Sequence, residues 1–541
     1  MTRHLLGAAA LTALVAAAPA LAQDRAADRG QGRRVTIQPY LEASQVLDAD
    51  LNNGGDVLTY TSVAAGVDAA VATRNTQGQV SARYERRFAY DRYTGDQDVV
   101  TGLARATTRL GNGLGLELGG LATRTREDIR GAAPALLVGN DANIAQVYSV
   151  YGGPTLSTYA GDVAVDAAYR AGYTSSRSAG YTGVVGQPSL DRFDHSFGQS
   201  ANARASLAPG VVLPVGVTLS GGWQQDRAGQ LRQHYDDVYG RGDLLLPVTP
   251  TLALAGGAGY EKLTVSQKLP LLTPAGAPVV DGQGRYVTDE ASPRRIAFRT
   301  DGVYWDAGVV WRPNHRTTVA ASAGLRYGSM SYTGRVDYQA SQSVGLSIRG
   351  YDQVTTFGQQ LRDTIAALPT SFIAARDAYS QQLNGCVFSA NGSTPGGCLD
   401  GVFQSISSAS YRARGVDGVL SATRGLSTYG LGAGYANRRL FVPFVPLGAV
   451  INGGEDQSAY AQAFWGRQLS RVSGIQANIF ADWYNPASTT ADIWSYGATA
   501  SYYHNFGRLG TTATLGIYDF KQGDLRSQVS AQAVLAGRYT F

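Results

Sequence analysis

The chain ends in VSAQAVLAGRYTF, from Val529 to Phe541, and this stretch decides the fold. Every second residue from Val529 is apolar, small or aromatic, whereas the positions between them are mostly polar, as at Gln532 and Arg538. Successive residues of a β-strand face opposite sides of the sheet. The pattern therefore predicts a strand with one apolar face that ends in aromatic rings and one wet face. A strand of this kind is typical of a barrel wall in lipid.

The same ending resembles the C-terminal signal by which barrel proteins are recognised for insertion into the bacterial outer membrane. Its residues here are Gly537, Tyr539 and Phe541. A soluble β-sandwich has no reason to place Tyr and Phe on that face at its terminus. We therefore expect the partners of the chain to include outer-membrane lipid and the barrel-assembly machinery.

Alternation continues through the rest of the chain, as in residues 80–88, 163–174 and 475–483. Short connections, expected on the periplasmic side, interleave with longer external ones. The short ones fall near residues 74–78, 110–113, 160–162, 208–210, 247–250, 312–315, 341–343, 424–426, 470–473 and 505–508. This predicts an all-β protein, one large antiparallel transmembrane β-barrel of about 22 strands within a range of 18–24, with both termini periplasmic. A secreted propeller or solenoid is the alternative, and the lack of a fixed repeat period argues against it.

The N-terminus has the features of an export signal. Arg3 and His4 precede a short apolar run, and Ala20-Leu21-Ala22 forms an A-x-A cleavage site. We therefore assign residues 1–22 to a signal peptide, 23–34 to a periplasmic linker and 35–541 to the barrel. A TonB-dependent transporter also has about 22 strands but needs a large globular plug before the first strand. Only residues 23–34 stand in that place, so the sequence argues against that class.

The composition favours a channel without selecting its solute. The chain has 67 Gly, 31 Tyr and a net charge of +5, and nearly all its basic residues are Arg. An arginine-lined lumen favouring anions explains this bias, and so does codon usage in a GC-rich genome. The candidates for lumen-facing charge are Arg83, Arg87, Arg105, Arg170 and Arg538. No basic run is typical of a nucleic-acid-binding surface, so we expect no nucleic-acid partner.

One connection, residues 352–410, is long enough to have structure of its own. Apolar residues at helical spacing predict helices over Thr355–Leu368 and Ser371–Leu383, separated at Pro369. Cys386 and Cys398 are the only cysteines, and in an exported protein we expect them to form a disulfide that stabilises the loop by about 3 kcal/mol. The strand count makes the insert external. It could fold inward to narrow the pore or stand above it as a cap.

Catalytic, metal-binding and cofactor-binding groups are not expected. The insert has no His and no further Cys that could complete a zinc site. An outer-membrane phospholipase needs a Ser-His pair on the wall, but His195 and Ser196 are neighbours and would face opposite sides of a strand. The sequence therefore predicts that the chain is not an enzyme.

Several short stretches resemble a group of large outer-membrane barrels associated with exopolysaccharide production and PEP-CTERM sorting. They are residues 38–42, 58–61, 84–87 and 326–328, together with the cysteine-bearing insert. Relatives in this group carry the label preprotein translocase subunit YajC, a small single-span protein whose design nothing in this chain matches. The resemblance implies a role in export or surface polysaccharide, with exopolysaccharide as a partner.

The sequence thus predicts a passive channel or export conduit for polysaccharide or anionic solutes. Two alternatives stay open. One is a structural barrel whose external loops bind polysaccharide, and the other is an accessory of secretion or assembly.

Overall fold

The computed structural model describes twelve segments of the chain. They are residues 34–52, 57–90, 97–128, 143–178, 192–373, 376–377, 380–383, 385–389, 395–404, 406–443, 454–486 and 491–541. The predicted signal peptide, and the predicted linker up to residue 33, lie outside the described residues.

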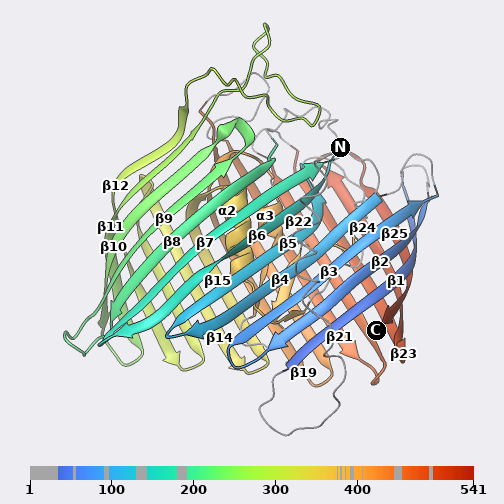
Figure 1. Ribbon diagram of the computed structural model, residues 1–541, viewed down its shortest axis with the longest axis horizontal. Helices are drawn as coiled ribbons and strands as arrows, with labels where there is room; N and C mark the ends of the chain where they lie inside the picture. Colours follow the sequence, from blue (N-terminus) through green and yellow to red (C-terminus); the bar gives the residue numbers. More distant parts are fainter. Residues whose placement is uncertain are drawn as a thin grey trace.

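The described chain forms a closed ring of 22 antiparallel strands (Figure 1). The first half of the ring is β1 (Arg34–Asp50), β2 (Val57–Ala72), β3 (Thr76–Ala89), β4 (Gln97–Gly111), β5 (Leu114–Arg126), β6 (Ile144–Ala160), β7 (Val163–Ser178), β8 (His195–Leu207), β9 (Gly216–Ala228), β10 (His234–Pro247) and β11 (Leu252–Gln267). The second half is β12 (Arg295–Asn314), β13 (Thr317–Arg326), β14 (Ser329–Ser341), β15 (Val344–Thr355), β19 (Ser410–Arg424), β20 (Ser427–Phe441), β21 (Glu455–Gln468), β22 (Ser473–Asn485), β23 (Ile493–Phe506), β24 (Leu509–Gln522) and β25 (Gln528–Thr540). Each strand pairs with the next along the chain, and β25 returns to β1.

The predicted fold class, strand count and order of connections are confirmed. All ten short turns fall within a few residues of the predicted positions, and they lie at the same end as Arg34 and Phe541. Among the residues that the structure describes, no helix has the length and apolarity to cross a bilayer. The chain is an outer-membrane β-barrel whose strands form the wall.

The two faces of the wall differ in the way that the alternation predicts. On β25 the side chains of Leu535, Tyr539 and Phe541 are exposed on the outer face. On β3 the outward Tyr84 is exposed, whereas the inward Arg87 is only 1% exposed. The exposed face is apolar because it meets lipid, and the buried face is polar because it lines the lumen.

Between β15 and β19 the chain folds into the barrel. This insert contains α2 (Phe357–Ala367), a three-stranded sheet of β16 (Phe372–Ile373), β17 (Cys386–Ser389) and β18 (Gly396–Cys398), and the short α3 (Asp400–Phe403). The helices appear within the ring of strands in Figure 1, and α2 contacts β5 to β8. Of the two placements that the sequence allowed, the structure shows the inward one.

The first predicted helix of the insert is confirmed and the second is wrong. Helix α2 begins after Thr356, whose hydroxyl accepts a hydrogen bond from the Gln359 N–H at 3.2 Å, and it ends before Pro369. Where residues 371–383 are described, Phe372 and Ile373 instead pair with β17. The Phe372 N–H also donates to Gln79 Oε1 on the wall at 2.8 Å. These tertiary hydrogen bonds override the local helical spacing.

One more short helix, η1 (Gln230–Arg232), lies in the external connection between β9 and β10. Another long external connection joins β11 to β12 and rises above the rim as a narrow arm (Figure 1). Isolated bridges hold its two sides together, for example Pro270 with Thr288. We call residues 268–294 the external arm.

The seam between β1 and β25 closes the barrel, and one arginine joins it to the neighbouring strand. The Arg538 guanidinium lies 3.5 Å from the ring centroid of Tyr40 on β1 and 2.5 Å from the carboxylate of Asp68 on β2. Tyr40 is itself buried, at 3% exposure. A cation over an aromatic ring contributes about 1–2 kcal/mol when it is partly desolvated.

We therefore expect Arg538→Gln to lower the temperature at which the folded barrel converts to the unfolded band in detergent gel electrophoresis. The matched control is Arg204→Gln, because the Arg204–Asp166 pair also lies on the inner face but both side chains are largely exposed. Such an exposed ion pair contributes little to the stability of the folded barrel. Equal conversion temperatures for the two variants would contradict this role of the seam.

Candidate functional site

The insert packs against one side of the lumen through an apolar helix face. Phe357, Leu361 and Ile365 of α2 are each at most 1% exposed. They join wall residues such as Leu121 and Val147 in one buried cluster. Complete burial of a large apolar side chain contributes about 1.5–3 kcal/mol, so this face holds the helix against the β4–β6 wall.

A buried arginine joins the same helix to the next part of the wall. Arg362 forms an ion pair with Asp226 on β9, and their side chains are 9% and 2% exposed. Its guanidinium also donates to Thr174 Oγ1 at 3.3 Å and to Ser196 Oγ at 3.4 Å. We call Arg362, Asp226, Thr174 and Ser196 the latch.

The wall leaves room for the latch by using glycine. A Cβ added at Gly198 would lie 1.9 Å from Arg362 Nη2, and one at Gly172 would lie 2.5 Å from Arg362 Cδ. Both positions face the lumen on adjacent strands. Any larger residue at Gly198 would occupy the place of the guanidinium.

The C-terminal end of α2 is held by a second arginine, the predicted lumen residue Arg105. Its guanidinium donates to the carbonyl of Ala366 at 2.6 Å and to that of Leu368 at 3.2 Å. The last carbonyls of a helix lack partners within the helix and carry partial negative charge, so a cation is favoured there. Arg105 thus fastens the helix end to β4.

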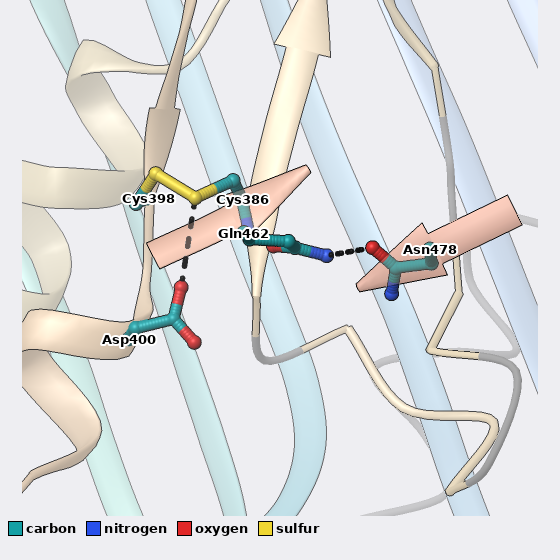
Figure 2. The surroundings of a disulfide bond; sticks show 5 residues. All are labelled: Cys386, Cys398, Asp400, Gln462 and Asn478. Carbon is teal, nitrogen blue, oxygen red and sulfur yellow. Dashed lines mark hydrogen bonds between the residues drawn. A yellow bond between two sulfur atoms is a disulfide. The ribbon is translucent and has the colours of Figure 1, made fainter. Parts of the chain in front are cut away.

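The far part of the insert rests on the opposite wall and is closed by a disulfide. Cys386 and Cys398 are bonded across β17 and β18. The Cys386 N–H donates to Gln462 Oε1 at 2.6 Å, and Gln462 donates in turn to Asn478 Oδ1 at 3.1 Å (Figure 2). A Cβ at Gly432 would lie 2.3 Å from Cys386 Sγ, so this part of β20 requires glycine.

Beside the disulfide lies the carboxyl group of Asp400 (Figure 2). Burial raises the pKa of Asp400 well above its usual range, and the nearby Asp482 and Asp377 carboxylates raise it further. Its Oδ2 lies 3.6 Å from Cys386 Sγ. A disulfide sulfur carries no hydrogen, so it can only accept, and only the protonated form of the carboxyl can donate to it. The three side chains lie close enough to hold a metal ion, but sulfurs bonded to each other offer no thiolate ligands.

The structure places the five predicted lumen arginines on the inner face, but each has a carbonyl or carboxylate partner. Glu85 lies between Arg83 and Arg87, at 3.1 and 2.7 Å, and all three are almost fully buried. Glu117 pairs with Arg170 and lies 3.8 Å from Arg105, while Arg538 pairs with Asp68. Arg83 has Glu42 as a second partner at 2.6 Å, so four carboxylates lie among these five arginines and offset most of their charge. Their predicted role in selecting anions stays a prediction.

The residues that complete these pairs were not singled out from the sequence. Glu85, Glu117, Asp226 and Arg362 all matter to the inner face. Alternation predicted that Glu85 shares a face with Arg83. It could not show that Asp226 on β9 meets Arg362 of the insert, because that contact spans 136 residues.

A different sector of the wall stays open to water. On β14, Arg335 and Asp337 form an ion pair with side chains that are 59% and 34% exposed. They share the inner face with Ser331, whereas Tyr332 and Tyr338 point outward. Arg349, opposite Arg335 on β15, is also exposed. The lumen is therefore wet beside β14 and β15.

A small pocket that is partly open to the lumen lies between α2 and the wall. Arg362 and Asp363 of the helix line it, together with Arg170 and Tyr151 of the wall. Arg362 is also the latch cation. Any group that occupies this pocket therefore touches the latch directly.

His195 and Ser196 lie on opposite faces of β8, as the sequence predicts. His195 lies 2.9 Å from Asp194 and stacks on the outward Tyr173. Ser196 points inward and belongs to the latch. The pair cannot act as nucleophile and base because the two side chains are separated by the wall.

Among known proteins, only solved structures are similar to this chain. No protein-family model and no curated protein matches the sequence. The iron transporter FrpB from Neisseria meningitidis matches at 10% identity with a TM-score of 0.42, over 93% of this chain and 82% of that chain. The siderophore receptor PirA from Acinetobacter baumannii matches at 9% and 0.40, over 94% and 81%. The ferric-catecholate import receptor Fiu from E. coli K12 matches at 10% and 0.42, over 93% and 81%.

These findings correct two sequence-based predictions. The resemblance to the exopolysaccharide-associated group is wrong, because the similar structures are iron and siderophore receptors. The predicted role as a polysaccharide conduit, anion channel or polysaccharide-binding barrel is wrong for the same reason. The similar structures are those of transporters and receptors, in agreement with the prediction that the chain is not an enzyme.

We expect Arg362→Leu to free α2 without weakening the barrel. The substitution leaves Asp226 buried without its cation, and loss of one partner of a buried pair costs about 3–5 kcal/mol. Hydrogen exchange measured by mass spectrometry should therefore become faster in peptides of residues 357–367, with no change in β1 to β5. Arg204→Leu is the control and should leave α2 unaffected. Unchanged exchange in α2 of the Arg362 variant would show that the latch does not hold the helix.

Proposed function

We propose that the chain is an outer-membrane receptor for the import of a specific ligand, and that the insert is its gate. The observation that carries this proposal is the position of α2, α3 and the three-stranded sheet, which belong to an external connection and pack inside the lumen. Both ends of the insert join strands at the external rim, through Thr355 and Ser410. A ligand arriving from outside the cell therefore meets the insert before it meets the periplasm.

The contacts of the insert suit an element that both closes and moves. Its apolar face keeps it seated, but the latch and Arg105 hold it through charged and hydrogen-bonding groups. Water or a polar ligand can take over such hydrogen bonds, because buried ion pairs contribute little net stability relative to their solvated state. A polar ligand that reached the pocket beside Arg362 would compete for its guanidinium and so loosen the helix.

The water-exposed sector of the inner wall beside β14 and β15 provides the route for a ligand once the insert moves. Contacts of α2, α3 and the small sheet fall on β3 to β9 and on β19 to β21. Movement of α2 away from the latch would open the pocket beside Arg362 toward the sector lined by Arg335 and Asp337. Inward transport is also the direction served by the ferric-catecholate import receptor Fiu, although the proposal rests on the insert.

Removal of the gate is the test in cells. Thr355 and Tyr411 pair across β15 and β19, so a short Gly-Ser turn can replace residues 357–408 without breaking the wall. We expect cells with this variant to become sensitive to vancomycin, a hydrophilic antibiotic too large for an intact outer membrane. Cells with the wild-type chain should stay resistant, and should accumulate a labelled ferric chelate in a saturable way that depends on the chain.

The matched control shortens the external arm across the Pro270–Thr288 bridge and leaves the insert in place. Resistance should be retained in that variant if its barrel is equally abundant. Two results would contradict the proposal. One is equal resistance of the gateless and wild-type cells, and the other is the absence of chain-dependent accumulation for every ferric chelate tried.

A further inference from the structure

The outward face of β9 to β12 carries a group of cations at its external end. Arg227 lies on β9, Lys262 on β11 and Arg299 on β12, and all three are exposed. Their strands lie side by side on one side of the barrel, beneath the external arm (Figure 1). We call these three residues the outer cationic patch.

The direction of these side chains follows from their strand neighbours. Tyr260 and Val303, two residues from Lys262 and four from Arg299, are 54% and 71% exposed on the outer face. The alternate residues Glu261 and Tyr304 are buried on the lumen side. Lys262 and Arg299 therefore point away from the lumen, toward whatever surrounds the barrel.

The height of the patch matches the headgroups of the outer leaflet. Lys262 is ten residues beyond Leu252, where β11 leaves its periplasmic turn. A transmembrane strand needs about 9–11 residues to cross the hydrocarbon. Tyr260 and Trp305, which are exposed just below this level, are the kind of residues that form an interfacial aromatic girdle. The cations therefore lie at the external boundary of the hydrocarbon, at the level of the outer-leaflet headgroups.

The patch keeps net positive charge after its nearby carboxylates are counted. Asp301 lies opposite Lys262 on the neighbouring strand. Its carboxylate already accepts hydrogen bonds from the Tyr260 hydroxyl and from the Arg299 guanidinium, the latter at 3.0 Å. Asp236 accepts from Gln225 at 3.3 Å and lies 3.9 Å from His234. Three cations face two carboxylates, and Arg227 forms no ion pair within the described part of the chain. An anion is therefore attracted to this face.

Below the patch the wall is apolar, as a lipid ligand requires. Val238, next to Lys262 across the sheet, is 48% exposed, and Leu244 further down β10 is 56% exposed. A molecule with phosphate groups at the level of Lys262 and acyl chains below it would match both surfaces. Outer-leaflet glycolipids that carry phosphate have this arrangement.

We propose that the outer cationic patch binds the phosphate groups of lipopolysaccharide in the outer leaflet. Lys262 and Arg299 lie diagonally across neighbouring strands and can contact one phosphate together, since such pairs are about 7–8 Å apart. Arg227 lies two strands away and nearer the external rim, where it meets a second phosphate or an acidic core sugar. The site anchors the β9–β12 wall to its lipid neighbour and is independent of the gate.

The test is a titration of the purified full-length barrel in detergent with bisphosphorylated lipopolysaccharide, followed by tryptophan fluorescence or native mass spectrometry. The variant is Lys262→Gln, Arg299→Gln and Arg227→Gln together. Each cation near an anionic membrane surface contributes enough that the three together should weaken binding roughly 100-fold. The control variant removes three cations from the external connections, Lys268, Arg232 and Arg285, and should bind like the wild type.

Two further ligands identify what is recognised. Dephosphorylated lipopolysaccharide should bind the wild type as weakly as intact lipopolysaccharide binds the patch variant. Phosphatidylglycerol, which has acyl chains and a single phosphate, should bind much more weakly than lipopolysaccharide. Equal affinity of the patch variant and the wild type would overturn the proposal, as would equal binding of the dephosphorylated form or of phosphatidylglycerol. Detergent gel electrophoresis of every variant verifies that the barrel is folded.

Discussion

The hydrocarbon core offers no hydrogen-bonding partners, so every backbone N–H and C=O of a membrane-spanning sheet must be paired within the protein. Closure of β25 onto β1 is what satisfies this constraint, with eleven paired positions from Tyr40 with Thr540 to Asp50 with Ser530. The other features depend on that closure. Alternate side chains are divided between lipid and lumen, and inner ion pairs such as Arg87–Glu85 are buried because the ring encloses them.

The ring also makes the insert possible. A wall of 22 strands encloses far more space than its own inward side chains fill. The insert occupies part of that space, with apolar packing at α2 and a disulfide-closed sheet on the opposite wall. The ion pair of Arg362 and the hydrogen bonds of Arg105 hold the insert in place, and they are separate from the backbone hydrogen bonds between the strands of the wall. The insert can therefore loosen while the barrel stays closed, and this separation is the physical basis for a gate.

Much of the fold could be predicted from the sequence because alternation and turn spacing are local signals. The thirteen residues that end in Phe541 identified the outer face, and the interleaved connections predicted both the strand count and the external origin of the insert. Helix α2 was predicted from apolar spacing and Pro369. The strand at Phe372 was not, because its hydrogen bonds come from Gln79 and β17, which are distant in sequence. The five arginines were placed on the inner face, but their ion pairs depend on partners such as Glu117 and Asp68, which the sequence alone did not single out.

Conductance in planar bilayers tests the central claim, that the insert closes a wide pore, most directly. The purified wild-type chain should show little steady current, whereas the variant with residues 357–408 replaced by a short turn should show large, uniform conductance steps. That result would mean that the wall alone is an open pore and the insert its closure. Equal large conductance of the two proteins would contradict the account, because the insert would then leave the lumen open.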